Sequence, residues 1–184
     1  MKRAGFIYEK IYSKENIANA IKQAAKGKTD RRAVKRVLSN FDDCVEKIQH
    51  MLITETYRLS DYRKKTIHEG IRQKERIICI PKFYPDQIIQ WALILQIQPL
   101  LCRGMDAHVC GSIPGRGGAC GKKYIERWLR NDRKHTKYCL KLDVHHFYPS
   151  IDHQCLKNML QRLFKDERLL NLLYKIVDSE AGLP

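Results

Sequence analysis

Apolar residues recur at three- and four-residue spacing in several segments of the chain, and this period predicts helices. Ser13 stands where a helix N-cap belongs and Gly27 where a helix ends, so the first of these segments has both boundary signals. The segment 86–101 differs from the others because it is strongly apolar throughout. The expected helices cover residues 14–26, 30–55, 86–101, 122–129, 153–164 and 167–177.

Two other stretches have the composition of strands. Thr66–Ile71 and Arg76–Ile80 flank a polar turn and end at Pro81, which predicts a two-stranded hairpin. A further apolar run ends at Asp143 and predicts a third strand. Helices and strands do not alternate regularly along the chain. We therefore expect an α+β fold with helices flanking a small, mostly antiparallel sheet.

The charge balance indicates the class of partner. Lys and Arg number 35 against 20 Asp and Glu, which gives a formal net charge of +15 in a chain of 184 residues. Such an excess predicts attraction to a polyanion, and nucleic acid is the leading partner. Two alternatives remain open, a basic protein that is merely soluble and a subunit whose acidic partner is another chain.

Cysteine usage and hydropathy indicate the compartment. The seven cysteines are an odd number without close pairs, and two of them, Cys79 and Cys139, lie within apolar runs, which favours reduced thiols in the cytoplasm. The N-terminal apolar run is too short for a signal peptide, and no run of about 18 apolar residues is present to span a bilayer. We expect a soluble cytoplasmic protein with no membrane partner.

The segment Leu140–Asp152 combines an apolar run, one carboxylate, an aromatic pair and a proline. Two-metal phosphoryl transfer uses several carboxylates around two divalent ions about 4 Å apart, and Asp143 can supply one such ligand. Magnesium prefers oxygen ligands, so the neighbouring His145 and His146 are poor candidates. Considered alone, Asp143 would be interpreted as the cap of a turn.

The whole string closely resembles the first catalytic segment of reverse transcriptases, the RNA-directed DNA polymerases. The resemblance implies that Asp143 is a catalytic residue and a ligand of the two Mg²⁺ ions. It also implies that Tyr148 excludes the ribose 2′-hydroxyl and so selects deoxynucleotides. Pro149 indicates that the strand is ending, and we expect the turn to bring Tyr148 and Asp143 together. The alternative for Tyr148 is an ordinary core aromatic.

The predicted hairpin resembles the fingers segment of the same family, in which a basic hairpin folds over the incoming triphosphate. The resemblance implies that Arg76, and after it Lys74, binds the substrate phosphates, whose negative charge grows during transfer. The alternative is a solvated hairpin tip. Weaker candidates are Lys64, Lys65 and Arg72.

A glycine-rich loop, Gly111–Gly121, also resembles a feature of the family. Gly115 and Gly117 allow backbone amides to approach phosphate oxygens closely, and Arg116 adds a positive fork for the template or primer backbone. These three residues are therefore the expected nucleic-acid contacts. A plain loop that leads into a helix is the alternative.

The resemblance divides the chain into three parts. Residues 1–60 are an expected helical extension, 61–135 the fingers and 136–184 the first part of the palm. Gly182-Leu183-Pro184 looks like the start of the next conserved block, and the Tyr-x-Asp-Asp turn with the other two carboxylates is absent from the sequence. We expect the chain alone to be inactive, with the remaining palm and thumb as a possible separate chain. Bacterial enzymes of the diversity-generating retroelement or group II intron type are the nearest in pattern; retrons and abortive-infection relatives stay open.

Three other signals carry less weight. Asp42 and Asp43 imitate the paired aspartates of the family but lie in a helical region before Asp143, so we expect solvent-facing carboxylates. Asp152 is expected to cap the helix that begins at His153. A zinc site is not expected, because no fourth ligand accompanies His108, Cys110 and Cys120 at a suitable spacing.

Two functions follow as competing hypotheses. The first is RNA-directed DNA synthesis by the whole protein, with RNA template, DNA primer and dNTP as partners and Mg²⁺ as cofactor. The second is a module that binds RNA or an RNA–DNA hybrid without chemistry. A basic scaffold protein remains only if the resemblance is a coincidence.

Overall fold

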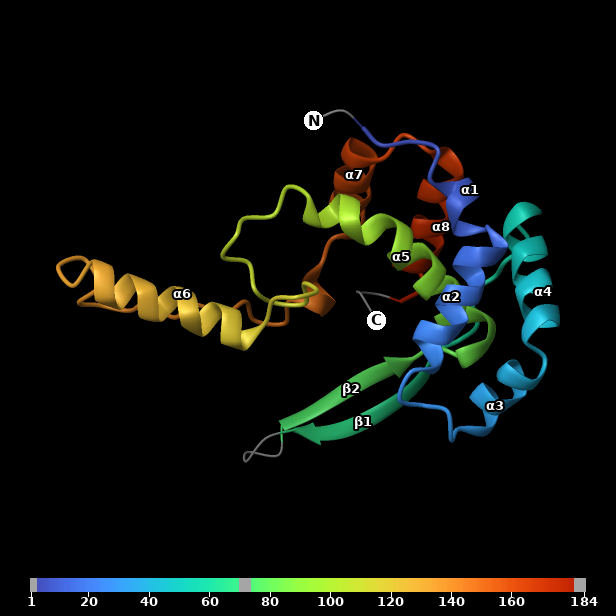
Figure 1. The fold of residues 1–184 in the computed structure, drawn as a ribbon, viewed down its shortest axis with the longest axis horizontal. Coiled ribbons are helices and arrows are strands. Elements are labelled where there is room, and N and C mark those ends of the chain that lie inside the picture. Colours follow the sequence, from blue (N-terminus) through green and yellow to red (C-terminus); the bar gives the residue numbers. More distant parts are fainter. Residues whose placement is uncertain (1–2, 70–73, 181–184) are drawn as a thin grey trace. The chain divides into compact units, whose positions relative to one another are not determined.

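The computed structural model describes residues 3–69 and 74–180. Backbone contacts divide the chain into a larger unit, Met1–Ile97 with His146–Pro184, and a smaller unit, Gln98–His145. Figure 1 shows the elements along the chain. The described residues form eight α-helices and a two-stranded antiparallel sheet, which confirms the α+β class.

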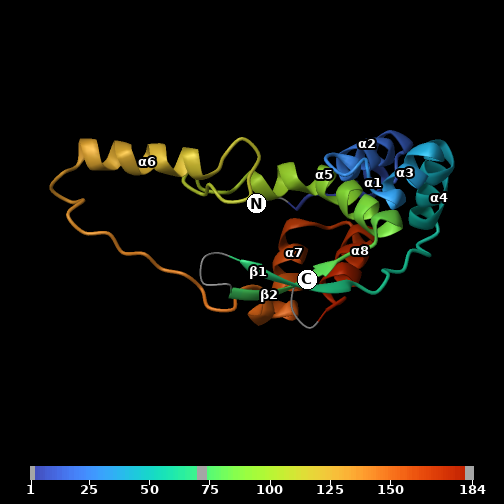
Figure 2. The same ribbon diagram turned by 90° about the horizontal axis from the view of Figure 1, so that it is seen from below.

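The N-terminal part of the larger unit is helical. Both views show its helices on one side of the first part of helix α5, which spans Ile88–Cys102 (Figures 1 and 2). The amide of Asn16 donates a hydrogen bond to Ser13 Oγ at 3.3 Å, which confirms the expected N-cap. Gly27 follows with a φ of +70°, a value that suits glycine at a helix end. The helices are α1 (Tyr8–Ile11), α2 (Lys14–Ala25), α3 (Arg32–Ser39) and α4 (Phe41–Ile53).

The single helical region expected over 30–55 is in fact two helices, α3 and α4. Asn40 separates them with φ −123° and ψ 45°, outside the helical region. Its side-chain amide donates to the carbonyl oxygen of Arg36 at 3.0 Å. Asparagine competes with the backbone for such hydrogen bonds and therefore favours helix ends. The apolar spacing continues across the break, so periodicity alone does not reveal it.

The predicted hairpin is present. Strands β1 (Arg63–Glu69) and β2 (Lys74–Ile80) pair antiparallel, with Arg63 opposite Ile80 and Ile67 opposite Arg76. The expected turn at 72–75 lies partly outside the described residues. Side chains alternate between the two faces of a strand pair. This register therefore puts Arg63, Lys65 and Arg76 on one face of the hairpin and Lys64 on the other.

Helix α5 (Ile88–Cys102) follows the short helix η1 (Phe83–Gln87), close to the range expected from sequence. A buried amide fixes its first part to the N-terminal helices. Asn16 donates to the carbonyl oxygens of Ile11 at 3.0 Å and Ala92 at 2.9 Å, and it accepts from Gln96 at 2.6 Å. Because a buried polar group is costly when unpaired, these bonds fix the position of α2 beside α5.

Two helices close the larger unit, α7 (His153–Leu163) and α8 (Glu167–Val177), where the sequence predicts them. Aspartates cap both. Cys155 donates its amide to Asp152 at 2.6 Å, and Leu169 donates its amide to Asp166 at 3.3 Å. The N-cap expected at Asp152 is therefore confirmed.

Asp166 also ties the two ends of the larger unit together. Its Oδ2 accepts the amides of Ile7 at 3.0 Å and Tyr8 at 2.9 Å. Beside it, Ala4 pairs with the chain at Leu163 and Lys165 through backbone hydrogen bonds of 2.8 Å. One carboxylate thus caps α8 and anchors the N-terminal segment that leads into α1.

The smaller unit contains helix α6 (Gly118–Asn131), which has no buried residue. The prediction of a strand that ends at Asp143 is wrong, because residues 138–144 have no regular secondary structure. Tyr138, Leu140 and Leu142 alternate as in a half-buried strand, yet they are 94%, 81% and 81% exposed. A strand needs a neighbour to complete its hydrogen bonds, and no ladder joins this segment to another strand among the described residues.

None of the helices in 3–69 and 74–180 has the length and apolar content needed to cross a bilayer. The apolar helix α5 has 15 residues, which is shorter than the roughly 20 that a bilayer requires.

The tie at Asp166 generates a stability prediction. Asp166→Ala leaves the amides of Ile7 and Tyr8 without their acceptor and removes a helix cap, so we expect the free energy of unfolding to fall by about 2 kcal/mol or more. Urea denaturation followed by circular dichroism measures this. Asp152→Ala removes only a cap and is the matched control, with a clearly smaller loss. Equal losses for the two variants would contradict the anchoring role.

Candidate functional site

Asp143 lies in the smaller unit and is exposed to solvent. Its Oδ1 accepts the amide of the next residue, Val144, at 3.0 Å. Among the described residues, no group of three or more His, Cys, Asp or Glu side chains is placed to hold a metal ion. Asp143 belongs to no such group in this part of the chain, and its role as a magnesium ligand stays a prediction.

Tyr148 lies in the larger unit, within the short 3₁₀ helix η2 (Tyr148–Ser150). Its ring is 61% exposed and meets the Phe147 ring edge to face, with 5.3 Å between the ring centres. Ser150 Oγ donates to the carbonyl oxygen of His146 at 2.7 Å, which closes the turn. The turn expected at Pro149 is thus present. Asp143 belongs to the other unit, so the pairing of Asp143 with Tyr148 stays a prediction.

Two of the candidate phosphate-binding residues, Arg76 and Lys74, belong to strand β2 of the hairpin. Arg76 is exposed on β2, on the same face as Lys65, while Lys74 begins β2 opposite Glu69. On the other face, Lys64 forms an ion pair of 2.9 Å with Glu180, and this contact raises the pKa of Lys64. The weaker candidate Arg72 lies outside the described residues. The roles of Arg76 and Lys74 stay predictions.

The glycine-rich loop of the smaller unit is held together by Arg116. Gly115 has a φ of +74° and Gly117 a φ of +152°, values that side chains disfavour, so the chain can turn sharply on both sides of the arginine. The Arg116 guanidinium faces the loop itself and donates from Nη1 to three backbone carbonyls. The acceptors are Asp106 at 2.9 Å, Ala107 at 3.3 Å and Val109 at 2.9 Å. Contact with a nucleic-acid backbone stays a prediction.

The signals of lesser weight have structural roles. Asp42 and Asp43 are exposed on the first turn of α4, and Asp43 forms an ion pair of 2.7 Å with Lys47, as expected of solvent-facing carboxylates. The amide of Cys155 holds the pKa of Asp152 below its usual range. The Asp106 carboxylate accepts the amide and the ring of His108, both at 2.8 Å, and these bonds lower the pKa of Asp106.

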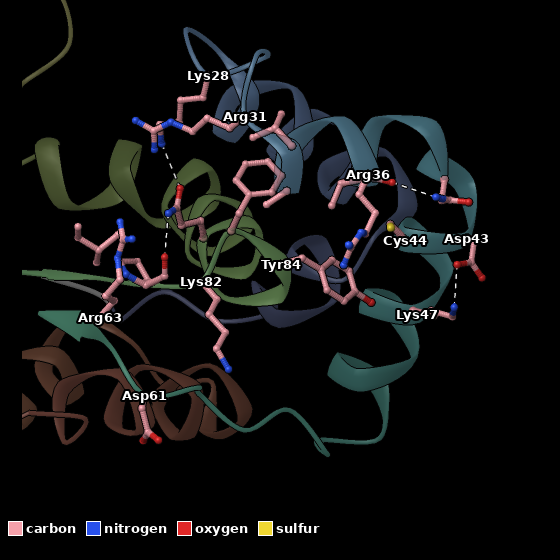
Figure 3. Close-up of a pocket in the computed structure, with 18 residues that line it drawn as sticks. Lys28, Arg31, Arg36, Asp43, Cys44, Lys47, Asp61, Arg63, Lys82 and Tyr84 are labelled. Carbon is pink, nitrogen blue, oxygen red and sulfur yellow. Dashed lines mark hydrogen bonds and ion pairs between the residues drawn. The ribbon is translucent and has the colours of Figure 1, made fainter.

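The larger unit contains a basic pocket that the sequence does not predict. It has a volume of about 740 Å³ and lies among α3, the start of α4, the first residue of β1 and residues 80–87 (Figure 3). Its floor is apolar, with Val34, Val37 and Phe83 all buried. Its cations are Lys28, Arg31, Arg36, Lys47, Arg63 and Lys82.

A buried pair positions the aromatic wall of this basic pocket. Asp86 is fully buried within η1 and accepts the phenolic hydrogen of Tyr57 at 2.9 Å. Burial raises the pKa of the Tyr57 hydroxyl, which keeps it a donor. Tyr84 lies two residues before Asp86 and has a non-helical backbone, with φ −117° and ψ 132°. The extended residue projects its half-buried ring into the lining of the pocket.

The sequence could not have identified this pocket from spacing alone. Its cations are scattered from Lys28 to Lys82 and meet only because the break at Asn40 and the turn at η1 fold α3 toward the base of the hairpin. The available signal was the density of positive charge at Arg31, Arg32, Lys35 and Arg36.

No protein-family model matches this chain, and no curated protein is significantly similar to it.

The loop geometry generates a prediction for Arg116. Arg116→Ala removes the donor that three carbonyls share, so we expect the amides of Val109 and Arg116, which close turns of this loop, to exchange hydrogen several-fold faster. Hydrogen exchange with mass spectrometry measures this. Arg103→Ala is the matched control in the same unit and should leave the exchange of those amides unchanged. Unaltered exchange in Arg116→Ala would show that the arginine does not brace the loop.

Proposed function

We propose that this chain is the fingers and first palm portion of an RNA-directed DNA polymerase. The observation that carries the proposal is the string Leu140–Asp152, in which one carboxylate ends an apolar run before an aromatic pair and a proline. Nucleotidyl transfer needs carboxylates that bind magnesium, and Asp143 is the candidate ligand of this chain.

Two features of the structure support the proposal. The hairpin β1–β2 carries Lys65 and Arg76 on one face, which suits the negative charge of a triphosphate. The chain turns at η2, which contains Tyr148, as Pro149 predicts. In this proposal Tyr148 selects the sugar, and Arg76 and Lys74 bind the substrate phosphates.

The charge supports nucleic-acid partners. A formal net charge of +15 attracts the phosphates of an RNA template and a DNA primer, and Arg116, Gly115 and Gly117 are the proposed backbone contacts in the smaller unit. All seven cysteines are free thiols, which favours a cytoplasmic location.

The proposal assigns chemistry to the complete enzyme rather than to the isolated chain. When bound, the magnesium ions supply the charge that stabilises the transferring phosphate. One carboxylate cannot hold two ions, so the proposed site needs further carboxylates beside Asp143. The isolated chain is accordingly proposed to be inactive.

A binding module without chemistry is the second candidate. It is favoured by the isolation of Asp143, since the described residues include no cluster of potential metal ligands around it. In that case the basic surface grips RNA or an RNA–DNA hybrid and Asp143 has no role in metal binding.

A single substitution tests the proposal. We expect Asp143→Asn to reduce RNA-templated DNA synthesis by on the order of a hundredfold or more, because the neutral amide loses the charge that binds the ion. The assay uses an epitope-tagged protein recovered from its own host with its bound partners, and it measures deoxynucleotide incorporation on a homopolymeric RNA template with a DNA primer and Mg²⁺.

Asp152→Asn is the matched control, because asparagine caps a helix as well as aspartate does and synthesis should persist. RNA bound to the recovered protein should be unchanged in both variants, and the isolated chain should give no product. Undiminished synthesis by Asp143→Asn would refute the metal role. A wild-type complex that binds RNA but never synthesises DNA would favour the binding module.

A further inference from the structure

We propose that the basic pocket of the larger unit binds a nucleoside phosphate, either as one unit of single-stranded RNA or as a free nucleotide. The inference rests on the pocket alone. It needs neither Asp143 nor the hairpin tip, so it stands or falls separately from the polymerase proposal.

Most of the cations in the pocket have no counter-charge. Two of its cations have partners: Lys28 donates to the Gln87 side chain at 3.0 Å, and Lys47 pairs with Asp43 at 2.7 Å. The charged side-chain groups of the other four form no hydrogen bond or ion pair with any residue in the described part of the chain. They are Arg31, Arg36, Arg63 and Lys82.

Cations held this close without a counter-charge repel one another, and an anion relieves the repulsion. Asp61 is the only other carboxylate in the lining, and it is exposed. Three of the four unpaired cations are arginines, whose planar forks match the oxygens of a phosphate in pairs. The charge and the donor geometry therefore favour a phosphate group.

An apolar surface lies beside the cations of the pocket. Val34, Val37 and Phe83 form a buried floor, and the half-buried Tyr84 stands in the wall. An inorganic phosphate makes no use of such a surface, whereas a nucleobase gains from stacking on an aromatic ring and from leaving water. Burial raises the pKa of Tyr84, so the ring carries no charge that would repel the phosphate.

Cations lie on both sides of the pocket, and the aromatic ring of Tyr84 lies on one of them. Figure 3 shows Lys28, Arg31 and Arg63 toward one side of the pocket and Arg36 and Tyr84 toward the other. A ligand that combines a phosphate with a flat ring can use both sides at once. The volume of about 740 Å³ is within the range of small-ligand pockets, roughly 300–1,000 Å³. It suits a nucleotide and is too small for a duplex.

The test compares two double variants of helix α3. Arg31→Ala/Arg36→Ala removes two pocket cations, whereas Arg32→Ala/Lys35→Ala removes two exposed cations that do not line the pocket. Both change the net charge equally. We expect the first to weaken binding of fluorescein-labelled decauridylate RNA to the purified chain by roughly tenfold or more, and the second by less than about threefold. Fluorescence anisotropy measures the affinities, and circular dichroism confirms that each variant is folded.

Tyr84 tests the nucleobase. Tyr84→Ala should weaken binding of the RNA, whereas Tyr84→Phe, which keeps the ring, should restore it. A second measurement needs no variant. RNA carrying 4-thiouridine, cross-linked to the wild-type chain by light, should attach to peptides that contain residues 31–36 or 80–84.

The two sources of the ligand are separated by a second probe. Equilibrium dialysis with radiolabelled ATP, up to about 1 mM, shows whether a free nucleotide binds. Binding of RNA alone identifies a strand unit and binding of ATP a free nucleotide; either result supports the pocket. Binding of neither probe, equal weakening by both double variants, or cross-links confined to other peptides would overturn the proposal.

Discussion

Positive charge that the chain cannot neutralise is the constraint on which this structure depends. With 35 basic and 20 acidic residues, many cations must remain without a carboxylate. Some of the acidic residues form ion pairs that join different elements, and self-repulsion of the remaining cations opposes the compact state unless an anion is bound. The joining pairs are Lys14–Glu46, Lys64–Glu180, Lys157–Asp178 and Arg168–Glu55.

Basic side chains gather at two places in the larger unit. In the larger unit the basic pocket combines Arg31 and Arg63 with an aromatic wall, and the hairpin face carries Lys65 and Arg76. Both arrangements suit phosphate-bearing ligands. The proposed chemistry differs in kind, because it rests on Asp143, a single carboxylate whose metal site the described residues do not complete. Nucleic-acid binding and catalysis are thus separate claims about one chain.

The sequence predicts the helices well and the site less well, for physical reasons. Ser13 and Asp152 predict the starts of their helices because capping is a local interaction. The hairpin is predictable because its strands are neighbours in sequence. The prediction of a strand before Asp143 is wrong because strand pairing depends on a distant partner, which the local alternation of apolar and polar residues does not reveal. The sequence does not predict the basic pocket for the same reason, because the break at Asn40 and long-range packing bring its residues together.

Iron-induced cleavage of the protein backbone tests the central claim most directly. Fe²⁺ can occupy magnesium sites made of oxygen ligands, and with ascorbate and peroxide it cuts the chain close to the bound ion. On the complex recovered from the host with an RNA–DNA primer–template, we expect cuts next to Asp143 that excess Mg²⁺ suppresses and Asp143→Asn abolishes. Cuts that avoid this segment, or that persist unchanged in the variant, would contradict a metal-binding role for Asp143.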